Sequence, residues 1–350
     1  MMKKALFIFF FLSLLIDAQG QDRLFSQFYA SPLTLNPALT GAFEGKYRVS
    51  AIYRDQWEPV MEDSYSTFST ALDLRWRVGE VKSKYKDYAA VGVMFYNDKA
   101  GLLELSTTSI LISGAFHKAL DLKSTQYISL GFQAGVAQKN VNYADVTFED
   151  QFNGTTGFSN PTNERLPDNN FAIGDYSVGL NYVFSPQYSK MRFFVGGAMH
   201  HFNEPSISFY HNDNPETDLP DNKLDARYSG QVSAFLPVSD GIQLQPRMII
   251  DKQGNHLKMD AGMNIRFDAS EYKNIAIHLG GYLRPVQDYD ESTRLDALVT
   301  LLGVEFNNVL IGMSYDLNLG ELSDFNRRTF EFSVAYLGEY EDDVILCPKF

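Results

Sequence analysis

The feature that most constrains this chain is a succession of long segments in which apolar side chains alternate with polar or small ones. They begin at Lys46, run for roughly 10–14 residues each, and are separated by breaks rich in turn-forming residues. In one of them Ile128, Leu130 and Phe132 share a face opposite Ser129. We predict fourteen strands, at residues 46–56, 64–77, 86–97, 103–118, 124–138, 172–185, 190–202, 224–236, 240–250, 256–268, 274–286, 294–305, 306–318 and 327–338.

The length of these segments decides which kind of sheet they form. Strands of globular proteins cluster near 5–6 residues, whereas a tilted strand needs about 9–11 residues to cross a bilayer. After Ile16 the chain has no apolar run of about 18 residues, so we expect no membrane-spanning helix. We therefore predict an all-β fold, a transmembrane antiparallel β-barrel of about fourteen strands, because only a closed sheet is tolerated in lipid.

A soluble β-sandwich or propeller is the alternative architecture, although the sequence shows no internal repeat at propeller-blade spacing. Composition favours the barrel. The chain has one cysteine, Cys347, and therefore cannot form an intramolecular disulfide, so stability must come from a large core or a closed sheet. Its 20 tyrosines and 27 phenylalanines can supply aromatic girdles at the two bilayer interfaces. A net charge of −13 argues against a nucleic-acid partner.

Two segments precede the strands. Residues 1–20 have a basic head, a short apolar run and small residues before Gln21, which is the layout of a cleaved signal peptide. Residues 21–45 are apolar but interrupted by Pro32 and Pro37, and Asn36 is disfavoured in the α region by the proline after it. We predict a plug or lid at residues 21–45, a barrel at residues 46–338 and a tail at residues 339–350.

The lengths of the breaks predict an orientation. Outer-membrane barrels have short periplasmic turns and longer outer loops. With both termini in the periplasm, the odd-numbered breaks face outward, and these include the long polar breaks at residues 139–171 and 203–223.

No catalytic, metal or cofactor site is predicted. An acidic loop contains Asp213, Glu216, Asp218 and Asp221, whose spacing does not match a calcium-binding EF-hand, which favours a solvated loop. His200 and His201 are adjacent in a strand and point to opposite faces, so they make a poor metal pair. The sequence contains no nucleophile elbow, zinc motif or phosphate loop, and a barrel enzyme would need a Ser–His pair meeting on one rim. We expect a protein that is not an enzyme.

The two ends of the chain carry recognisable motifs. They are Ser26-Gln27-Phe28-Tyr29, Pro32, Asn36-Pro37-Ala38, Gly41, Tyr53-Arg54-Asp55-Gln56-Trp57, Ile311-Gly312-Met313-Ser314-Tyr315-Asp316 and the ending Cys347-Pro348-Lys349-Phe350. With these motifs the chain resembles the PorP/SprF family, outer-membrane proteins tied to type IX secretion and gliding in Bacteroidota. The resemblance spans about the whole mature chain.

The resemblance implies a set of structural signature residues and no catalytic ones. The plug and signature residues are Asn36, Pro37, Gly41, Tyr53, Arg54, Asp55 and Trp57. Arg54 and Asp55, at the end of the first strand beside Trp57, are expected to lock the plug to the barrel wall. A surface Arg–Asp pair with an interfacial tryptophan is the alternative, and it would contribute little.

The resemblance also implies a function at the cell outer membrane. The barrel would sit in outer-membrane lipid, retain a secreted adhesin or cargo protein at its outer surface, and dock a periplasmic motor-ring or peptidoglycan-binding subunit. The alternative is a transporter of hydrophobic small molecules similar to the FadL family, which also has an apolar N-terminal plug and an Asn-Pro-Ala near its start. A lipid-sized apolar cavity would favour the transporter, whereas the Tyr53 to Trp57 motif and the C-terminal motifs favour the secretion component.

Overall fold

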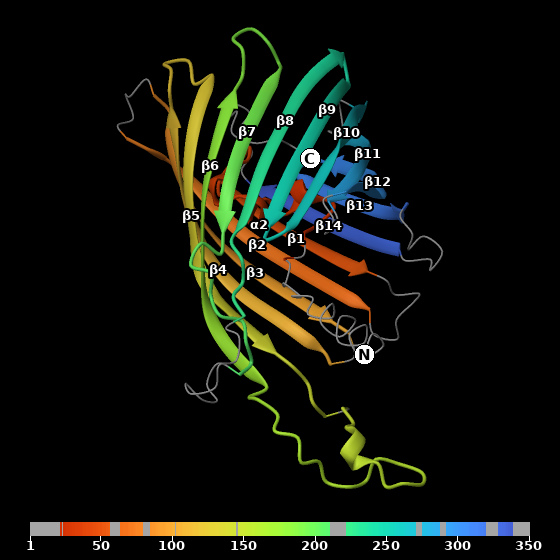
Figure 1. Cartoon of the computed structure of the whole chain (residues 1–350). Helices are drawn as coiled ribbons and strands as arrows, with labels where there is room; N and C mark the ends of the chain where they lie inside the picture. Colours follow the sequence, from red (N-terminus) through yellow and green to blue (C-terminus); the bar gives the residue numbers. More distant parts are fainter. Residues whose placement is uncertain are drawn as a thin grey trace, which may run out of the picture.

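A computed structural model shows a closed barrel of fourteen strands (Figure 1). It describes residues 22, 24–56, 64–79, 85–101, 103–144, 146–210, 222–270, 275–287, 292–319 and 328–338. The strands are β1 (Tyr47–Gln56), β2 (Tyr65–Val78), β3 (Asp87–Ala100), β4 (Leu105–Ala119), β5 (Gln126–Asn140), β6 (Asn170–Phe184), β7 (Arg192–His200), β8 (Arg227–Ser239), β9 (Ile242–Gln253), β10 (His256–Ser270), β11 (Ile275–Gln287), β12 (Thr293–Phe306), β13 (Val309–Asn318) and β14 (Arg328–Gly338). In the described part of the chain, no helix is long and apolar enough to span a membrane.

The wall closes because the first strand pairs with the last. Each strand is antiparallel to its neighbours in sequence, and β1 pairs with β14 from Tyr47 opposite Gly338 to Gln56 opposite Thr329. The strand count and the antiparallel closed sheet are therefore confirmed. We call the end where β1 begins and β14 ends the terminus end, and the opposite end, where the odd-numbered connections lie, the loop end.

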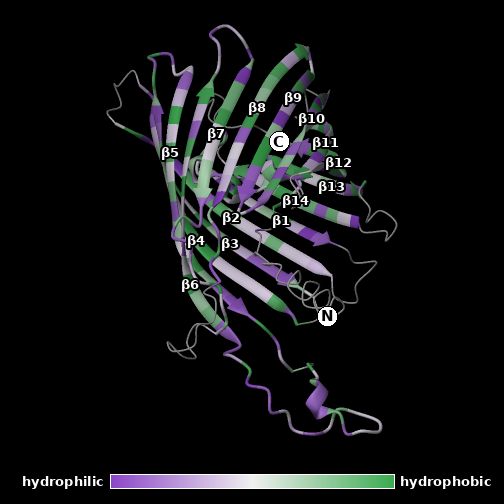
Figure 2. Cartoon of the chain, in the orientation of Figure 1, coloured by the Kyte–Doolittle hydropathy of each residue, from purple (hydrophilic) through white to green (hydrophobic). Residues whose placement is uncertain are grey.

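Hydrophobic and hydrophilic residues alternate along the strands (Figure 2), and their burial shows that the apolar side chains lie on the outer face and the polar ones on the inner face. In β5, Leu130 is 61% exposed on the outside, whereas Ser129 and Gln133 are buried inside. In β14, Phe332 points outward while Glu331 is fully buried. Apolar residues exposed all around a soluble protein would cause aggregation, but they match the hydrocarbon core of a bilayer.

The two longest connections, β5–β6 and β7–β8, lie at the loop end, although the β9–β10 turn there holds only two residues, 254–255. At the terminus end the β8–β9 and β12–β13 turns hold two residues each, at 240–241 and 307–308. At the loop end the β5–β6 connection, residues 141–169, extends well beyond the strands and contains the 3-10 helix η3 (Glu149–Gln151) (Figure 1). The acidic cluster at residues 213–221 and the predicted tail at 339–350 lie outside the described residues.

The N-terminal segment, residues 24–46, lies inside the ring of strands (Figure 1). It forms the 3-10 helix η1 (Phe28–Ala30), the single helical turn α2 (Pro32–Leu35) and the 3-10 helix η2 (Pro37–Leu39). A proline begins α2 and another begins η2, and Asn36 between them is extended, as expected of a residue before proline. Leu33, Ala38 and Phe43 are fully buried. The breaks seen in the sequence thus produce a compact rod of short turns.

Candidate functional site

The candidate site is the barrel interior, where the N-terminal segment runs from the loop end to the terminus end. The Asp22 carboxylate lies 3.3 Å from Arg227. Its backbone N–H donates to the side-chain oxygen of Gln253, the last residue of β9. Twenty-two residues further on, Glu44 forms an ion pair with Arg192, the first residue of β7. Because these strand positions lie at opposite ends of the barrel, the segment passes along the lumen before it enters β1.

Glu331 of β14 binds the backbone at the start of the segment. Its two carboxylate oxygens accept hydrogen bonds from the N–H groups of Ser26 (2.7 Å) and Gln27 (2.8 Å). The Gln27 side chain in turn donates to the Glu331 carbonyl oxygen and accepts from the hydroxyl of Ser333. A carboxylate that accepts backbone N–H groups makes charge-assisted hydrogen bonds, which are stronger than neutral ones. The segment is therefore fixed to β14 in a defined position.

Arg284 of β11 joins the same part of the segment to two further carboxylates. Its guanidinium lies 2.7 Å from Asp260, 2.7 Å from Asp316 and 2.7 Å from the hydroxyl of Ser26. Ser26 itself donates to Asp316. All four side chains are buried, so removing the cation would leave uncompensated charge away from water.

The predicted locking residues fall on two faces of β1. Arg54 points inward, is 8% exposed, lies 3.2 Å from Glu331 and donates to the carbonyl oxygen of Leu24 in the N-terminal segment. Tyr53 and Asp55 lie on the opposite face, where the tyrosine hydroxyl donates to the Asp55 carboxylate at 3.3 Å. Trp57 lies outside the described residues. Arg54 thus contacts the segment together with Glu331, a partner that the sequence alone did not suggest.

Asn36 and Pro37 lie where the segment comes closest to the wall. The side-chain NH2 of Asn36 donates to the backbone carbonyl oxygens of Leu180 (3.0 Å) and Gly197 (3.2 Å). The side-chain oxygen of Asn36 accepts from the backbone N–H of Ala38. Opposite it is Gly179, where an added Cβ would lie 1.9 Å from the Asn36 side-chain oxygen. The wall therefore has a glycine where the plug residue requires close approach.

Gly41 has a left-handed backbone, with φ of 72°, which glycine adopts without strain. Its N–H donates to Asp73 at 2.7 Å, and an added Cβ would lie 2.2 Å from the Cβ of Ala90. Asp73 also accepts two hydrogen bonds from Arg48. The terminus end of the segment is thereby held by a buried, bidentate Arg–carboxylate pair, the geometry in which such pairs are strongest.

Three histidines, His117, His200 and His201, contact the N-terminal segment. His117 contacts the carbonyl oxygen of Thr40 at 2.8 Å, and His200 contacts that of Leu35 at 3.2 Å. His201, one residue beyond the end of β7, bridges Asp22 (2.6 Å) and Asp175 (2.7 Å). Burial disfavours the charged imidazolium, but the two carboxylates outweigh it and raise the pKa of His201 to about 9. Among the described residues no group of three His, Cys, Asp or Glu side chains could hold a metal ion.

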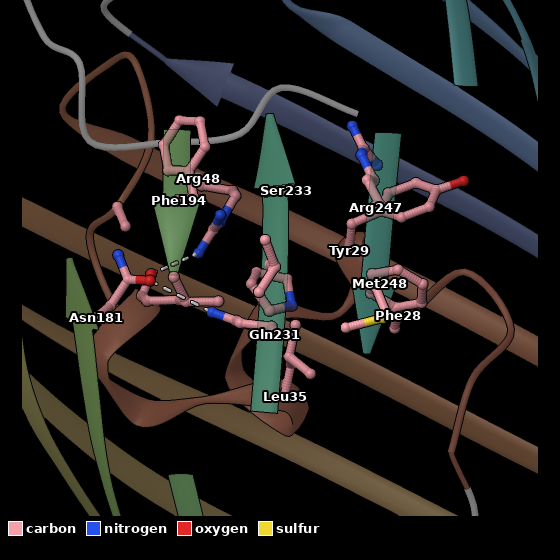
Figure 3. Close-up of a pocket in the computed structure, with 14 residues that line it drawn as sticks. Phe28, Tyr29, Leu35, Arg48, Asn181, Phe194, Gln231, Ser233, Arg247 and Met248 are labelled. Carbon is pink, nitrogen blue, oxygen red and sulfur yellow. Dashed lines mark hydrogen bonds between the residues drawn. The ribbon is translucent and has the colours of Figure 1, made fainter. Parts of the chain in front are cut away.

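Cavities remain on both sides of the segment. Figure 3 shows the most apolar one, a small cavity of about 40 Å³ beside Phe28, Tyr29 and Leu35. A second, with about 160 Å³, lies near His200 and His201. A third, with about 540 Å³, opens at the loop end and has polar and charged residues in its lining. Sequence reasoning missed this charged mouth, because its residues come from six strands, β1 and β8 to β12, and from the N-terminal segment.

The closed wall, the apolar outer face and the polar interior define a β-barrel protein of the bacterial outer membrane. A family model described as "Type IX secretion system membrane protein PorP/SprF" matches residues 17–336. The chain belongs to that family, so the resemblance noted from its motifs is confirmed. The family and the fold are those of a secretion or channel barrel rather than of an enzyme class.

Solved structures with a similar fold are hydrocarbon channels and related barrels. The CymD monoaromatic hydrocarbon channel is 12% identical with a TM-score of 0.47, covering 92% of this chain and 96% of that one. The Ralstonia pickettii toluene transporter TbuX is 10% identical with a TM-score of 0.46, over 92% and 96% of the two chains. A Pseudomonas aeruginosa FadL homologue is 10% identical with a TM-score of 0.44, over 86% and 92%. At these values the likeness carries no argument about cargo. Comparison with curated proteins finds no match.

Proposed function

We propose that this protein is a docking barrel of the type IX secretion machinery that retains a secreted adhesin or cargo protein at its outer surface. On the periplasmic side it docks a motor-ring or peptidoglycan-binding subunit. The observation that carries this proposal is the position of the N-terminal segment, which lies along the lumen from Asp22 to Glu44 and bonds to strands all around the wall. A barrel filled in this way offers surfaces at its two ends rather than a wide passage.

The contacts favour a segment that stays in place. To leave the lumen, residues 26–41 would have to give up their charge-assisted bonds to Glu331 and Asp73 as well as the neutral bonds of Asn36. Hydrogen bonds to charged groups contribute about 1.5–3 kcal/mol each, and each buried partner left behind adds a desolvation cost. The segment therefore acts as a structural part of the docking barrel, with Arg54 among the residues that fasten it.

The loop end suits the capture of a protein partner. The β5–β6 connection is mostly exposed and held in shape by its own hydrogen bonds, such as those that the Thr162 hydroxyl and the Asn163 N–H donate to the Asp150 carboxylate. Loops placed on a rigid scaffold are where binding residues concentrate. With the termini in the periplasm, this connection faces the cell exterior, where a secreted adhesin would meet it.

An affinity pull-down from the native outer membrane tests the proposal. The tagged protein, solubilised mildly, is expected to recover a large secreted protein together with periplasmic ring or peptidoglycan-binding subunits, identified by mass spectrometry. A variant whose residues 148–162 are replaced by a short Gly-Ser linker is expected to lose the secreted partner and keep the periplasmic one. A matched linker replacement of the terminus-end turn at 120–125 should keep the secreted partner.

Recovery of the protein alone, or with bound lipid or fatty acid only, would overturn the docking proposal and favour uptake of hydrophobic compounds. That alternative requires an apolar cavity of lipid size. The apolar cavity beside Phe28 and Tyr29 is too small for a fatty acid, so we do not advance uptake as a second candidate.

A further inference from the structure

The charged mouth at the loop end is a built cavity rather than an open surface. Its volume is about 540 Å³, and it lies between the N-terminal segment, β1 and β8 to β12. This is the size range of small-molecule sites, so it fits one or two side chains of a partner rather than a folded domain. Arg227, Asp251, Lys258 and Arg284 line it, and each is contributed by a different strand.

The cations of this cavity already have carboxylate partners. Arg284 lies 2.7 Å from Asp260 and from Asp316, and Lys258 lies 3.0 Å from Asp260. Arg227 lies 3.3 Å from Asp22, which is also bridged by His201. These three positive charges are committed to acids other than Asp251, and Arg54 of the same lining is paired with Glu331, so these four cations do not form a free anion-binding site.

Asp251 has no such partner. It is 5% exposed, lines the cavity, and neither of its carboxylate oxygens has a hydrogen-bond donor among the described residues. Lys258 faces it across the β9–β10 pair but directs its ammonium to Asp260, and Arg227 is within electrostatic reach yet bonds to Asp22 and the Thr34 carbonyl oxygen. Buried carboxylates are normally hydrogen-bonded, so this one requires a donor that enters from the cavity.

We propose that Asp251 is the anchor of a binding site for an organic cation, a guanidinium or an ammonium group. A divalent metal fits less well, because it needs several oxygen ligands and no group of three candidate ligands exists among the described residues. A guanidinium donates to both oxygens of a carboxylate at once, the geometry that would satisfy both unbonded atoms of Asp251. We assign the cation to an arginine or lysine side chain of the docked secreted protein, an assignment that rests on the proposed function.

Binding of a defined peptide to the full-length protein in a neutral detergent tests the site. The probe is acetyl-Gly-Arg-Gly-amide, and its matched control carries citrulline, which is neutral and nearly the same shape. We expect the arginine peptide to bind and the citrulline peptide to bind at least tenfold more weakly. Asp251→Asn should weaken the arginine peptide at least tenfold, whereas Asp296→Asn, which removes another carboxylate of the same cavity, should change it less than threefold.

The other outcomes overturn the inference. Equal binding of the two peptides, no binding of either, or equal losses from the two variants would each exclude Asp251 as a specific cation anchor. The shift of the folded barrel on unheated gels shows whether a variant that loses binding is still folded. Asp251→Glu keeps the charge and should keep binding of the arginine peptide. A folded Asp251→Glu barrel that does not bind this peptide would also overturn the inference.

Two further arms separate the source of the cation from the site itself. Methylguanidinium that competes fully with the peptide at equal concentration would assign the site to a free small cation instead of a protein segment. In the pull-down, loss of the secreted partner with Asp251→Asn supports a side chain of that partner. If wild type recovers no secreted partner, the docking function fails while peptide binding still decides on the site.

Discussion

At the scale of single residues, the interior depends on buried charges that are satisfied only in combination. Replacing Arg284 with Gln removes the cation shared by Asp260 and Asp316. Breaking a buried ion pair from one side costs about 3–5 kcal/mol, so we expect a loss of that order in the free energy of unfolding. Lys99→Gln is the control, since Lys99 and Glu104 form a half-exposed pair, and such surface pairs contribute little to stability. Urea unfolding of both variants in lipid vesicles measures the difference, and equal losses would contradict the expectation.

Close approach of the segment to the wall gives a second residue-scale prediction. Gly179→Ala places a Cβ 1.9 Å from the Asn36 side-chain oxygen and must displace the Asn36 hydrogen bonds. Overpacking of this kind costs about 1–3 kcal/mol. Gly230→Ala is the matched control in the same wall, because a Cβ there meets nothing within 4 Å. We expect a lower thermal midpoint for the first variant only, and identical midpoints would show that the segment does not press against Gly179.

Residue partners mark the limit of what the sequence predicts. The motif around Arg54 identifies an important position, and the alternation of β1 places it on the polar face. Its partner Glu331 lies 277 residues away and becomes its neighbour only when β1 pairs with β14. Asp251 is likewise one acid among many in the sequence. Only the assembled wall shows that Asp251 is buried at the mouth with neither carboxylate oxygen bonded to a donor of the described residues, whereas Asp22 is paired with Arg227 and His201.

At the scale of elements, the start of the N-terminal segment is held by a titratable contact. The pKa of His201 is about 9 in the folded protein, above its usual value near 6.5, because Asp22 and Asp175 favour the charged ring. A raised folded-state pKa stabilises the protein fully below the unfolded pKa, and the contribution disappears as pH rises through the folded one. The contact is therefore complete below about pH 6.5 and lost above about pH 9.

The His201→Gln variant measures this contribution. We expect it to be about 3 kcal/mol less stable than wild type near pH 6, with the gap narrowing steadily and nearly closing by about pH 10. Unfolding of both proteins across this range, at constant ionic strength, gives the gap directly. A gap that stays constant with pH would mean that His201 acts through packing rather than through its charge.

Elements were the part of the structure that the sequence predicted best. Alternation over long segments located all fourteen strands, because the bilayer and the lumen impose opposite demands on successive side chains. The ends of the strands were predicted less accurately. For example, β8 was predicted at 224–236 and is observed at Arg227–Ser239. A strand ends where its neighbours stop pairing, and that depends on β7 and β9 rather than on local sequence. The prolines predicted an irregular segment before β1, yet not its path through the lumen.

At the scale of the whole molecule, the orientation in the membrane is open to direct measurement. In a Cys347→Ser background, Thr156→Cys in the β5–β6 connection is expected to react with a membrane-impermeant maleimide on intact cells. Leu122→Cys, equally exposed but in the β4–β5 turn at the terminus end, should react only after the outer membrane is permeabilised. The reverse pattern would place the long loops in the periplasm.

The bonds around Glu331 have a consequence for how the barrel is built. Arg54 and Glu331 face each other across the pairing of β1 with β14, which closes the barrel, and residues 24–27 bond to both. The position of residues 24–27 therefore depends on the register of β14 against β1. A slip of β14 by one residue would turn Glu331 toward lipid and leave Ser26 and Gln27 without an acceptor. The contacts that hold the segment in the lumen therefore also fix the register of the strand pair that closes the barrel.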